Sequence, residues 1–105
     1  MQSMFSNNDT AHALESLGVR LKSARLAKGD NQAMFARRIG VSVPTLRSME
    51  QGSATVAMGA WAAALWMLSR LQDIELVLEI RESLFEQLDR QPKVRQRARH
   101  KKQAP

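Results

Sequence analysis

The sequence predicts an all-α fold of five helices, followed by a basic C-terminal tail. Apolar residues recur at helical spacing in successive segments, and capping residues and glycines separate these segments. With 105 residues, 44% of them hydrophobic, the chain can bury one modest core. We expect a flexible N-terminus at residues 1–9, a folded domain at 10–80, an acidic and apolar extension at 81–91 and a disordered tail at 92–105.

The first helix is expected from about Thr10 to Lys28. Asp9 or Thr10 can cap its start, and Gly29 is a natural stop. One face of this segment carries an apolar stripe at helical spacing, made of Leu14, Leu17, Leu21 and Ala24.

Residues 31–52 predict two more helices joined by a tight turn. Asn31 can cap the second helix, Gly40 can take the positive φ that ends it, and Ser42 can cap the third. Pro44 fits the first turn of the third helix, where its missing N–H would have no intrahelical partner. This is the build of a helix-turn-helix, whose second helix lies in the DNA major groove.

Two further segments complete the predicted domain. Met58 to Leu68 forms a fourth helix, in which Trp61 faces the core and Trp66 points elsewhere. Trp66 is then free for a partner, or both tryptophans are core and rim residues of a monomer. Residues 72–78 predict a fifth helix, although the alternation over residues 75–80 also fits a short edge strand.

Several classes of protein are excluded or disfavoured. The chain has no cysteine, which excludes disulfides and thiolate metal sites. The longest apolar run, residues 56–68, is shorter than the roughly 20 residues that span a bilayer, so we expect a cytoplasmic protein without membrane contact. An enzyme, a metal site and a cofactor are not expected, because His12 and His100 lack paired carboxylates or a second ligand.

The positive charge is unevenly distributed. The net charge is +6, but residues 90–105 hold seven of the 16 basic groups, so residues 1–89 carry nine basic and ten acidic groups. Residues 20–47 hold seven basic groups against Asp30 alone, which predicts a positive end of the domain that faces DNA. The basic tail can anchor DNA nonspecifically, bind an acidic partner or only solubilise the chain.

A known family shares these residues. The residues that carry the likeness run through the first three helices: Leu17-Gly18-Val19-Arg20-Leu21 with Arg25, Asn31-Gln32, Phe35-Ala36, Ile39-Gly40-Val41-Ser42, Leu46 and Met49-Glu50-Gln51-Gly52. From about residue 17 to 78 the chain resembles the Xre/Cro-type helix-turn-helix domain of lambdoid phage repressors. The resemblance implies a lambda-repressor-like fold and a salt bridge between Arg25 and Glu50 that locks the first helix to the third.

The resemblance also implies the residues that contact DNA. Those expected to read bases are Ser42, Val43, Pro44, Arg47 and Ser48, and Thr45 is a further expected DNA contact. Gln32 is expected to meet a phosphate through its backbone N–H and to brace a base-reading side chain through its amide. Those expected to meet phosphates are Arg20, Lys28, Asn31 and Arg38.

The chain departs from the family at three of the positions that surround the DNA. Val43 and Pro44 replace glutamines and can pack only against thymine methyl groups, while Arg47 can read guanine or hold a phosphate. Asp30 replaces an apolar residue and places an acid near the expected phosphate contacts.

A homodimer on a palindromic operator is expected, because one helix reads only a few base pairs and two copies about 34 Å apart read both half-sites. The expected interface residues are Trp61, Trp66, Leu76, Leu78 and Ile80.

A narrower resemblance covers residues 56–58, 68–71, 82–88 and 95–99. These segments are similar to HipB-type antitoxins. That likeness implies a repressor that autoregulates a toxin–antitoxin operon and binds a HipA-like Ser/Thr kinase toxin, alone or with a further small antitoxin protein. A stand-alone phage or metabolic repressor, and an interaction adaptor that has lost specific DNA binding, are the alternatives.

Overall fold

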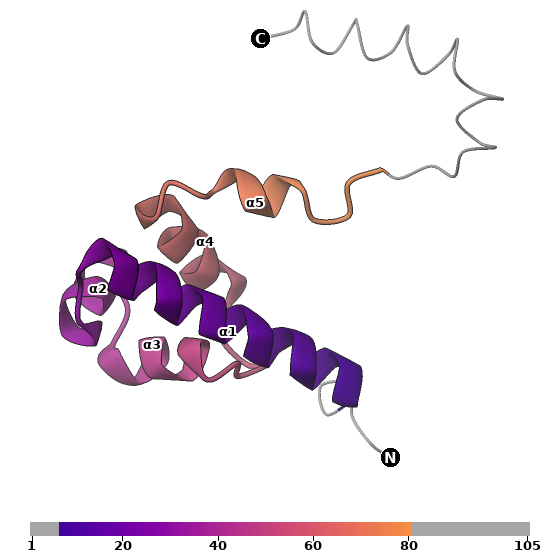
Figure 1. Ribbon diagram of the computed structural model, residues 1–105, viewed down its shortest axis with the longest axis horizontal. Helices are drawn as coiled ribbons and strands as arrows, with labels where there is room; N and C mark the ends of the chain where they lie inside the picture. The colour runs from indigo at the N-terminus through magenta and orange to yellow at the C-terminus, as the bar shows by residue number, and fades with distance from the viewer. Residues whose placement is uncertain (1–6, 81–105) are drawn as a thin grey trace, which may run out of the picture.

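The computed structural model describes residues 7–80, which form five helices and no strand (Figure 1). The prediction of an all-α, five-helix fold is therefore confirmed. The predicted extension at 81–91 and tail at 92–105 lie outside the described residues. In chain order the helices are α1 (Asn8–Lys28), α2 (Gln32–Ile39), α3 (Val43–Glu50), α4 (Met58–Met67) and α5 (Gln72–Glu75).

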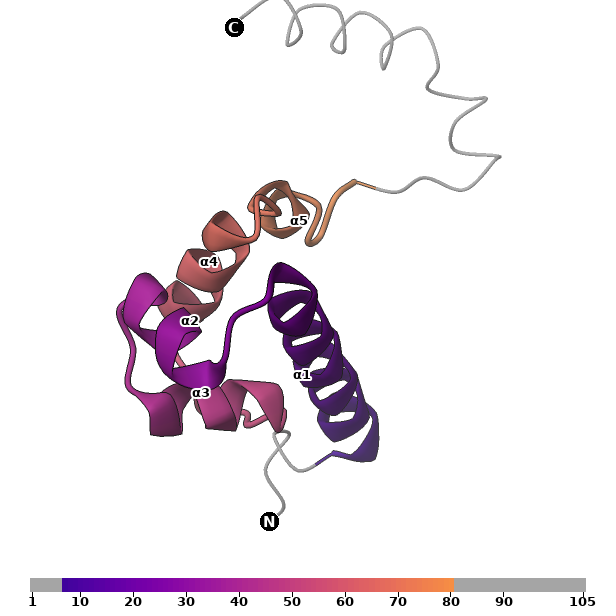
Figure 2. The same ribbon diagram turned by 60° about the vertical axis from the view of Figure 1, so that its left-hand side comes forward.

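The helices are arranged so that α3 lies at one end. α1 packs against α3, and α2 packs against both α3 and α4. Figure 2 shows α3 and α5 at opposite ends, with α2 and α4 between them. One side of α3 therefore faces outward. Within residues 7–80, every helix is too short or too polar to cross a bilayer.

The turn between α2 and α3 follows the predicted chemistry. The Asn31 carboxamide oxygen accepts a bond from the Met34 N–H (2.8 Å) at the start of α2, and Gly40 ends that helix at φ 78°. The Ser42 hydroxyl accepts from the Thr45 N–H (3.1 Å) and so caps α3. Each cap is a local interaction, which explains why short sequence patterns predicted it.

The start of α1 differs from the prediction. Asn7, rather than Asp9 or Thr10, is the N-cap, and its side-chain oxygen accepts from the N–H groups of Asp9 (2.8 Å) and Thr10 (3.2 Å). The helix consequently begins at Asn8, two residues earlier than expected.

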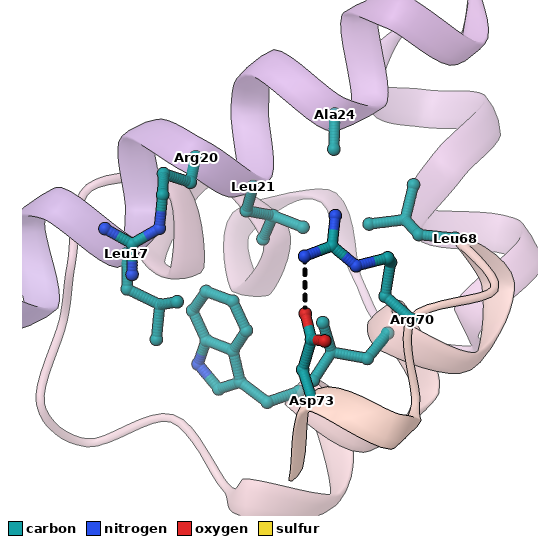
Figure 3. Close-up of a pocket in the computed structure, with 9 residues that line it drawn as sticks. Leu17, Arg20, Leu21, Ala24, Leu68, Arg70 and Asp73 are labelled. Carbon is teal, nitrogen blue, oxygen red and sulfur yellow. Dashed lines mark ion pairs between the residues drawn. The ribbon is translucent and has the colours of Figure 1, made fainter. Parts of the chain in front are cut away.

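The end of the described chain is less regular than predicted. α5 is a single turn that stops at Glu75, and residues 76–80 form neither the longer helix nor the edge strand. Leu78 has φ 60° and is 95% exposed, so no packing offsets the loss of helical hydrogen bonds there. A pocket opens between α1, α4 and the segment leading into α5 (Figure 3).

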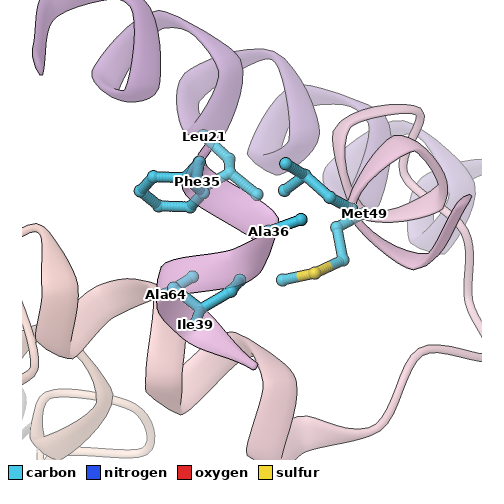
Figure 4. Packing of buried hydrophobic residues seen from close by; sticks show 7 residues of the cluster. Leu21, Phe35, Ala36, Ile39, Met49 and Ala64 are labelled. Atoms are coloured by element: carbon cyan, nitrogen blue, oxygen red, sulfur yellow. The ribbon is translucent and has the colours of Figure 1, made fainter. Parts of the chain in front are cut away.

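The core lies where the first four helices meet. Phe35, Leu46 and Met49 are fully buried, and the rest of the cluster surrounds them (Figure 4). The surrounding members are Leu21, Ala36, Ile39 and Ala64. Because α2 and α3 supply most of these side chains, the same cluster that stabilises the domain sets the angle between the two helices.

Candidate nucleic-acid interface

The outward side of α3 carries one row of exposed residues. Pro44, Arg47 and Gln51 are exposed, and Ser48 is half-buried beside them. Their spacing of three or four residues places them on one side of the helix. Gln51 was not among the predicted contacts, although its position one turn after Arg47 is a signal that could have identified it.

Three other predicted DNA contacts are engaged within the chain. The Ser42 hydroxyl donates to the Thr45 hydroxyl (2.9 Å) at the beginning of α3. Val43 is half-buried and packs against the core cluster, so the structure does not place it in the exposed row. The predicted contact of Val43 with thymine is therefore the least compatible with the structure.

A buried ion pair joins α1 to the end of α3. The Arg25 Nε donates to Glu50 Oε2 (2.6 Å) and its Nη2 to Glu50 Oε1 (3.1 Å), with side chains 5% and 4% exposed. The remaining Nη1 of Arg25 donates to the Asp30 carbonyl oxygen (2.8 Å). Such a two-pronged pair fixes direction as well as distance, because the guanidinium and the carboxylate are both planar.

Gln32 joins the same network. Its Nε2 donates to Glu50 Oε1 (3.0 Å), which ties the first turn of α2 to the last turn of α3. The sequence predicted that this amide braces a base-reading side chain; in the structure the side chain that it braces is Glu50. Glu50 thus holds α1 and α2 at once, and the orientation of α3 follows from both.

The backbone of α1 lies very close to the backbone at the end of α3. A Cβ atom at Gly18 would lie 2.5 Å from the Glu50 carbonyl oxygen. At Gly52, with φ 83°, a Cβ would lie 2.6 Å from the Cα of Glu15. No pattern in the sequence predicted this approach, because it depends on which two helices meet.

A family model described as a helix-turn-helix domain matches residues 16–75. The chain belongs to this helix-turn-helix family. No curated protein and no solved structure matches it. The match confirms the helix-turn-helix part of the resemblance and makes the chain a DNA-binding transcription regulator, in a family that is typically not enzymatic. The narrower likeness to HipB-type antitoxins stays a prediction.

Two of the phosphate contacts predicted for the helix-turn-helix protein already have partners in the chain. Arg38 Nη1 donates to both carboxylate oxygens of Asp30 (2.9 and 3.1 Å), whose side chain is 5% exposed. Asn31 uses its side-chain oxygen to cap α2. Asp30 therefore neutralises one arginine of the positive end, which lowers the charge available to a phosphate.

The remaining two predicted phosphate contacts, Lys28 and Arg20, lie in different parts of α1. Lys28 is exposed at the end of α1, next to the loop that precedes α2. Arg20 donates to the Ser16 hydroxyl (2.8 Å) and lines the pocket beside α4. Since Gly18 faces α3 and successive helical residues turn by about 100°, Arg20 lies on the opposite side of α1. The structure does not bring Arg20 to α3.

The predicted dimer residues divide into two groups. Trp61 is half-buried, packs against the core and lines the pocket beside α1. Trp66 is 66% exposed, and Leu76, Leu78 and Ile80 are exposed as well. We call Trp66, Leu76, Leu78 and Ile80 the exposed apolar set.

Proposed function

We propose that this chain is a homodimeric, sequence-specific transcriptional repressor that places α3 of each copy in the major groove. The observation that carries the proposal is the exposed row of Pro44, Arg47 and Gln51 on a helix whose opposite side is fixed by the buried ion pair of Arg25 and Glu50. A rigid helix with a polar outer row can meet base edges without first ordering itself.

The exposed row offers three kinds of contact. Arg47 can bind guanine or a phosphate, Gln51 can form two bonds with adenine, and Pro44 can pack against a thymine methyl group. The first N–H groups of α2 have no intrahelical acceptor, and Asn31 satisfies only that of Met34. The free amides can bind a phosphate at the positive end of the α2 dipole.

Two copies are needed because each α3 reads only a few base pairs. Trp66 lies in the last turn of α4, and Leu76, Leu78 and Ile80 follow α5, which lies at the end of the described chain opposite α3 (Figure 2). An interface there leaves both reading helices uncovered. Exposed apolar side chains that gather on one region are typical of association surfaces.

Operator binding tests the proposal directly. DNA upstream of the coding sequence, and a random-sequence selection, provide the operator. In a mobility-shift titration at fixed salt, Arg47→Ala should weaken binding by about 10-fold, since one good base contact contributes about 1–3 kcal/mol. Arg70→Ala removes an equal charge far from α3 and should change affinity by less than about 2-fold.

A second variant addresses the bracing of α3. Gln32→Ala removes the bond to Glu50 and should also weaken operator binding, while sedimentation shows the dimer unchanged. If the mobility shift is the same for wild type, Arg47→Ala and Gln32→Ala, the repressor assignment is wrong. An adaptor without specific DNA binding would give that result.

We further propose a toxin–antitoxin role, which rests on the resemblance to HipB-type antitoxins alone. The chain would repress its own operon and bind a HipA-like Ser/Thr kinase, with or without a further small antitoxin protein. Copurification of the full chain with the products of the adjacent genes tests this. A neighbouring gene set without any kinase would leave a stand-alone repressor instead.

Deleting residues 92–105 tests whether this segment binds DNA or the toxin. If it anchors DNA, its removal lowers the salt dependence of operator binding by nearly one unit of slope for each phosphate that it binds. If it binds the kinase, the pull-down fails and the salt slope is unchanged. A chain that keeps both properties without these residues shows that they only solubilise it.

A further inference from the structure

The pocket between α1 and α4 is separate from the DNA-facing side of the domain. Its volume is about 120 Å³. Leu21 and Ala24 from α1 and Leu68 from the end of α4 face into it (Figure 3). Leu17, Trp61 and Leu65 complete an apolar floor. Because α3 contributes no residue, a molecule bound here does not compete with DNA for the same atoms.

Charged side chains stand at the rim of this pocket. Arg20 comes from α1, Arg70 precedes α5, and Asp73 lies in the first turn of α5. Arg70 Nη2 pairs with Asp73 Oδ2 (2.8 Å), at side-chain exposures of 60% and 37%. Arg20 has a bond to the Ser16 hydroxyl but no carboxylate partner among residues 7–80. The rim therefore carries a net charge of +1, which favours an anion.

From this combination of apolar floor and cationic rim we infer that the pocket binds a small aromatic carboxylate with a single ring. The volume of about 120 Å³ is close to the roughly 150 Å³ of an engineered apolar cavity that accepts benzene, which favours a single six-membered ring over a fused system. Trp61 supplies an aromatic surface for the ring. The carboxylate meets Arg20 at the rim, where a guanidinium offers two parallel N–H donors.

The site is distinct from the proposed DNA contact, but both depend on α1. Arg20 and Ala24 face the pocket, while Gly18 and Arg25 hold α3. A ligand that fits one position of α1 better than another would bias the placement of α3 by that difference in affinity. Binding itself, however, does not require the chain to bind DNA.

Fluorescence of Trp61 reports on the pocket. The chain has two tryptophans and no tyrosine, so Trp66→Phe leaves Trp61 as the only tryptophan. In the full chain carrying this change, phenylacetate should alter the emission and saturate. Phenylacetamide, which has the same ring without the charge, should bind about 10-fold more weakly. Acetate alone should give no saturable signal.

Two variants locate the ligand. Arg20→Gln should weaken phenylacetate about 10-fold and leave phenylacetamide unchanged. Ala24→Leu fills the floor and should abolish both, and its thermal unfolding curve checks that it is folded. The inference is overturned if phenylacetate gives no saturable change, or if it binds Arg20→Gln as tightly as the parent. The inference is also overturned if Trp61 emission changes with the concentration of the protein and not with that of phenylacetate. That result would mean that a second copy of the chain occupies the pocket.

Discussion

Removing the charge of Glu50 should destabilise the domain far more than removing an exposed charge. Glu50→Gln keeps the shape of the side chain and an acceptor for Arg25, but it leaves the guanidinium, 5% exposed, without a counter-charge. Breaking a buried pair in this way costs about 3–5 kcal/mol. That is a large share of the roughly 5–15 kcal/mol by which small domains are stable.

The matched control is the exposed pair of Arg70 and Asp73, whose side chains are 60% and 37% exposed. Arg70→Gln should lower the free energy of unfolding by less than about 1 kcal/mol, because exposed pairs contribute little. Urea unfolding followed by far-ultraviolet circular dichroism measures both variants. Since 1 kcal/mol corresponds to about 4–8 °C in a domain of this size, Glu50→Gln should lower Tm by more than about 12 °C.

A double-mutant cycle at Arg25 and Glu50 distinguishes the loss of the ion pair from a general loss of packing. Adding Arg25→Met to Glu50→Gln should cost much less than Arg25→Met alone, because the cation that lost its partner is removed with it. The reasoning is refuted if Glu50→Gln lies within about 1 kcal/mol of Arg70→Gln. Strict additivity of the two changes at Arg25 and Glu50 would refute it as well.

Three further predictions concern other contacts. Gly18→Ala should destabilise the domain by about 1–3 kcal/mol, because its Cβ would meet the backbone of Glu50, whereas Gly59→Ala, with open space around it, should be neutral or stabilising in urea unfolding. Ser42→Ala removes the cap of α3 and should cost about 1 kcal/mol in the same assay. Trp66→Ser with Leu78→Ser should shift the chain toward monomer in sedimentation velocity and leave its helical spectrum intact, and an unchanged dimer would rule out the exposed apolar set as the interface.

The helix-turn-helix could be predicted from the sequence because its determinants are local. Asn31 and Ser42 cap helices through bonds to residues three positions away, and Phe35 and Leu46 follow the helical period. Local preferences of this kind agree here with the packing of the whole domain. Residues 76–80 could not be settled in the same way, since their apolar alternation has no structure to pack against within the described chain.

The roles of individual side chains were harder to predict, because they depend on residues distant in sequence. Gln32 lies 18 residues from Glu50, yet their hydrogen bond decides what its amide can do. Asp30 and Arg38 neutralise one another only because the α1–α2 loop turns toward the second half of α2. Val43 occupies a position that often reads DNA, but the core takes its side chain. Spacing along the sequence contains none of this information.

The composition of the exposed row on α3 favours the proposed dimer. In each copy, Arg47 on α3 and Gln51 directly after it are the side chains of the exposed row able to form two hydrogen bonds with one base, while Pro44 offers only apolar contact. At about 1–3 kcal/mol for each such contact, one copy gains roughly 2–6 kcal/mol of discrimination. DNA-binding proteins typically bind their specific site more tightly than nonspecific DNA by roughly 4–10 kcal/mol. In the proposed dimer, two copies on a palindrome would gain roughly 4–12 kcal/mol, which covers the whole range of a specific regulator, whereas one copy reaches only its lower part.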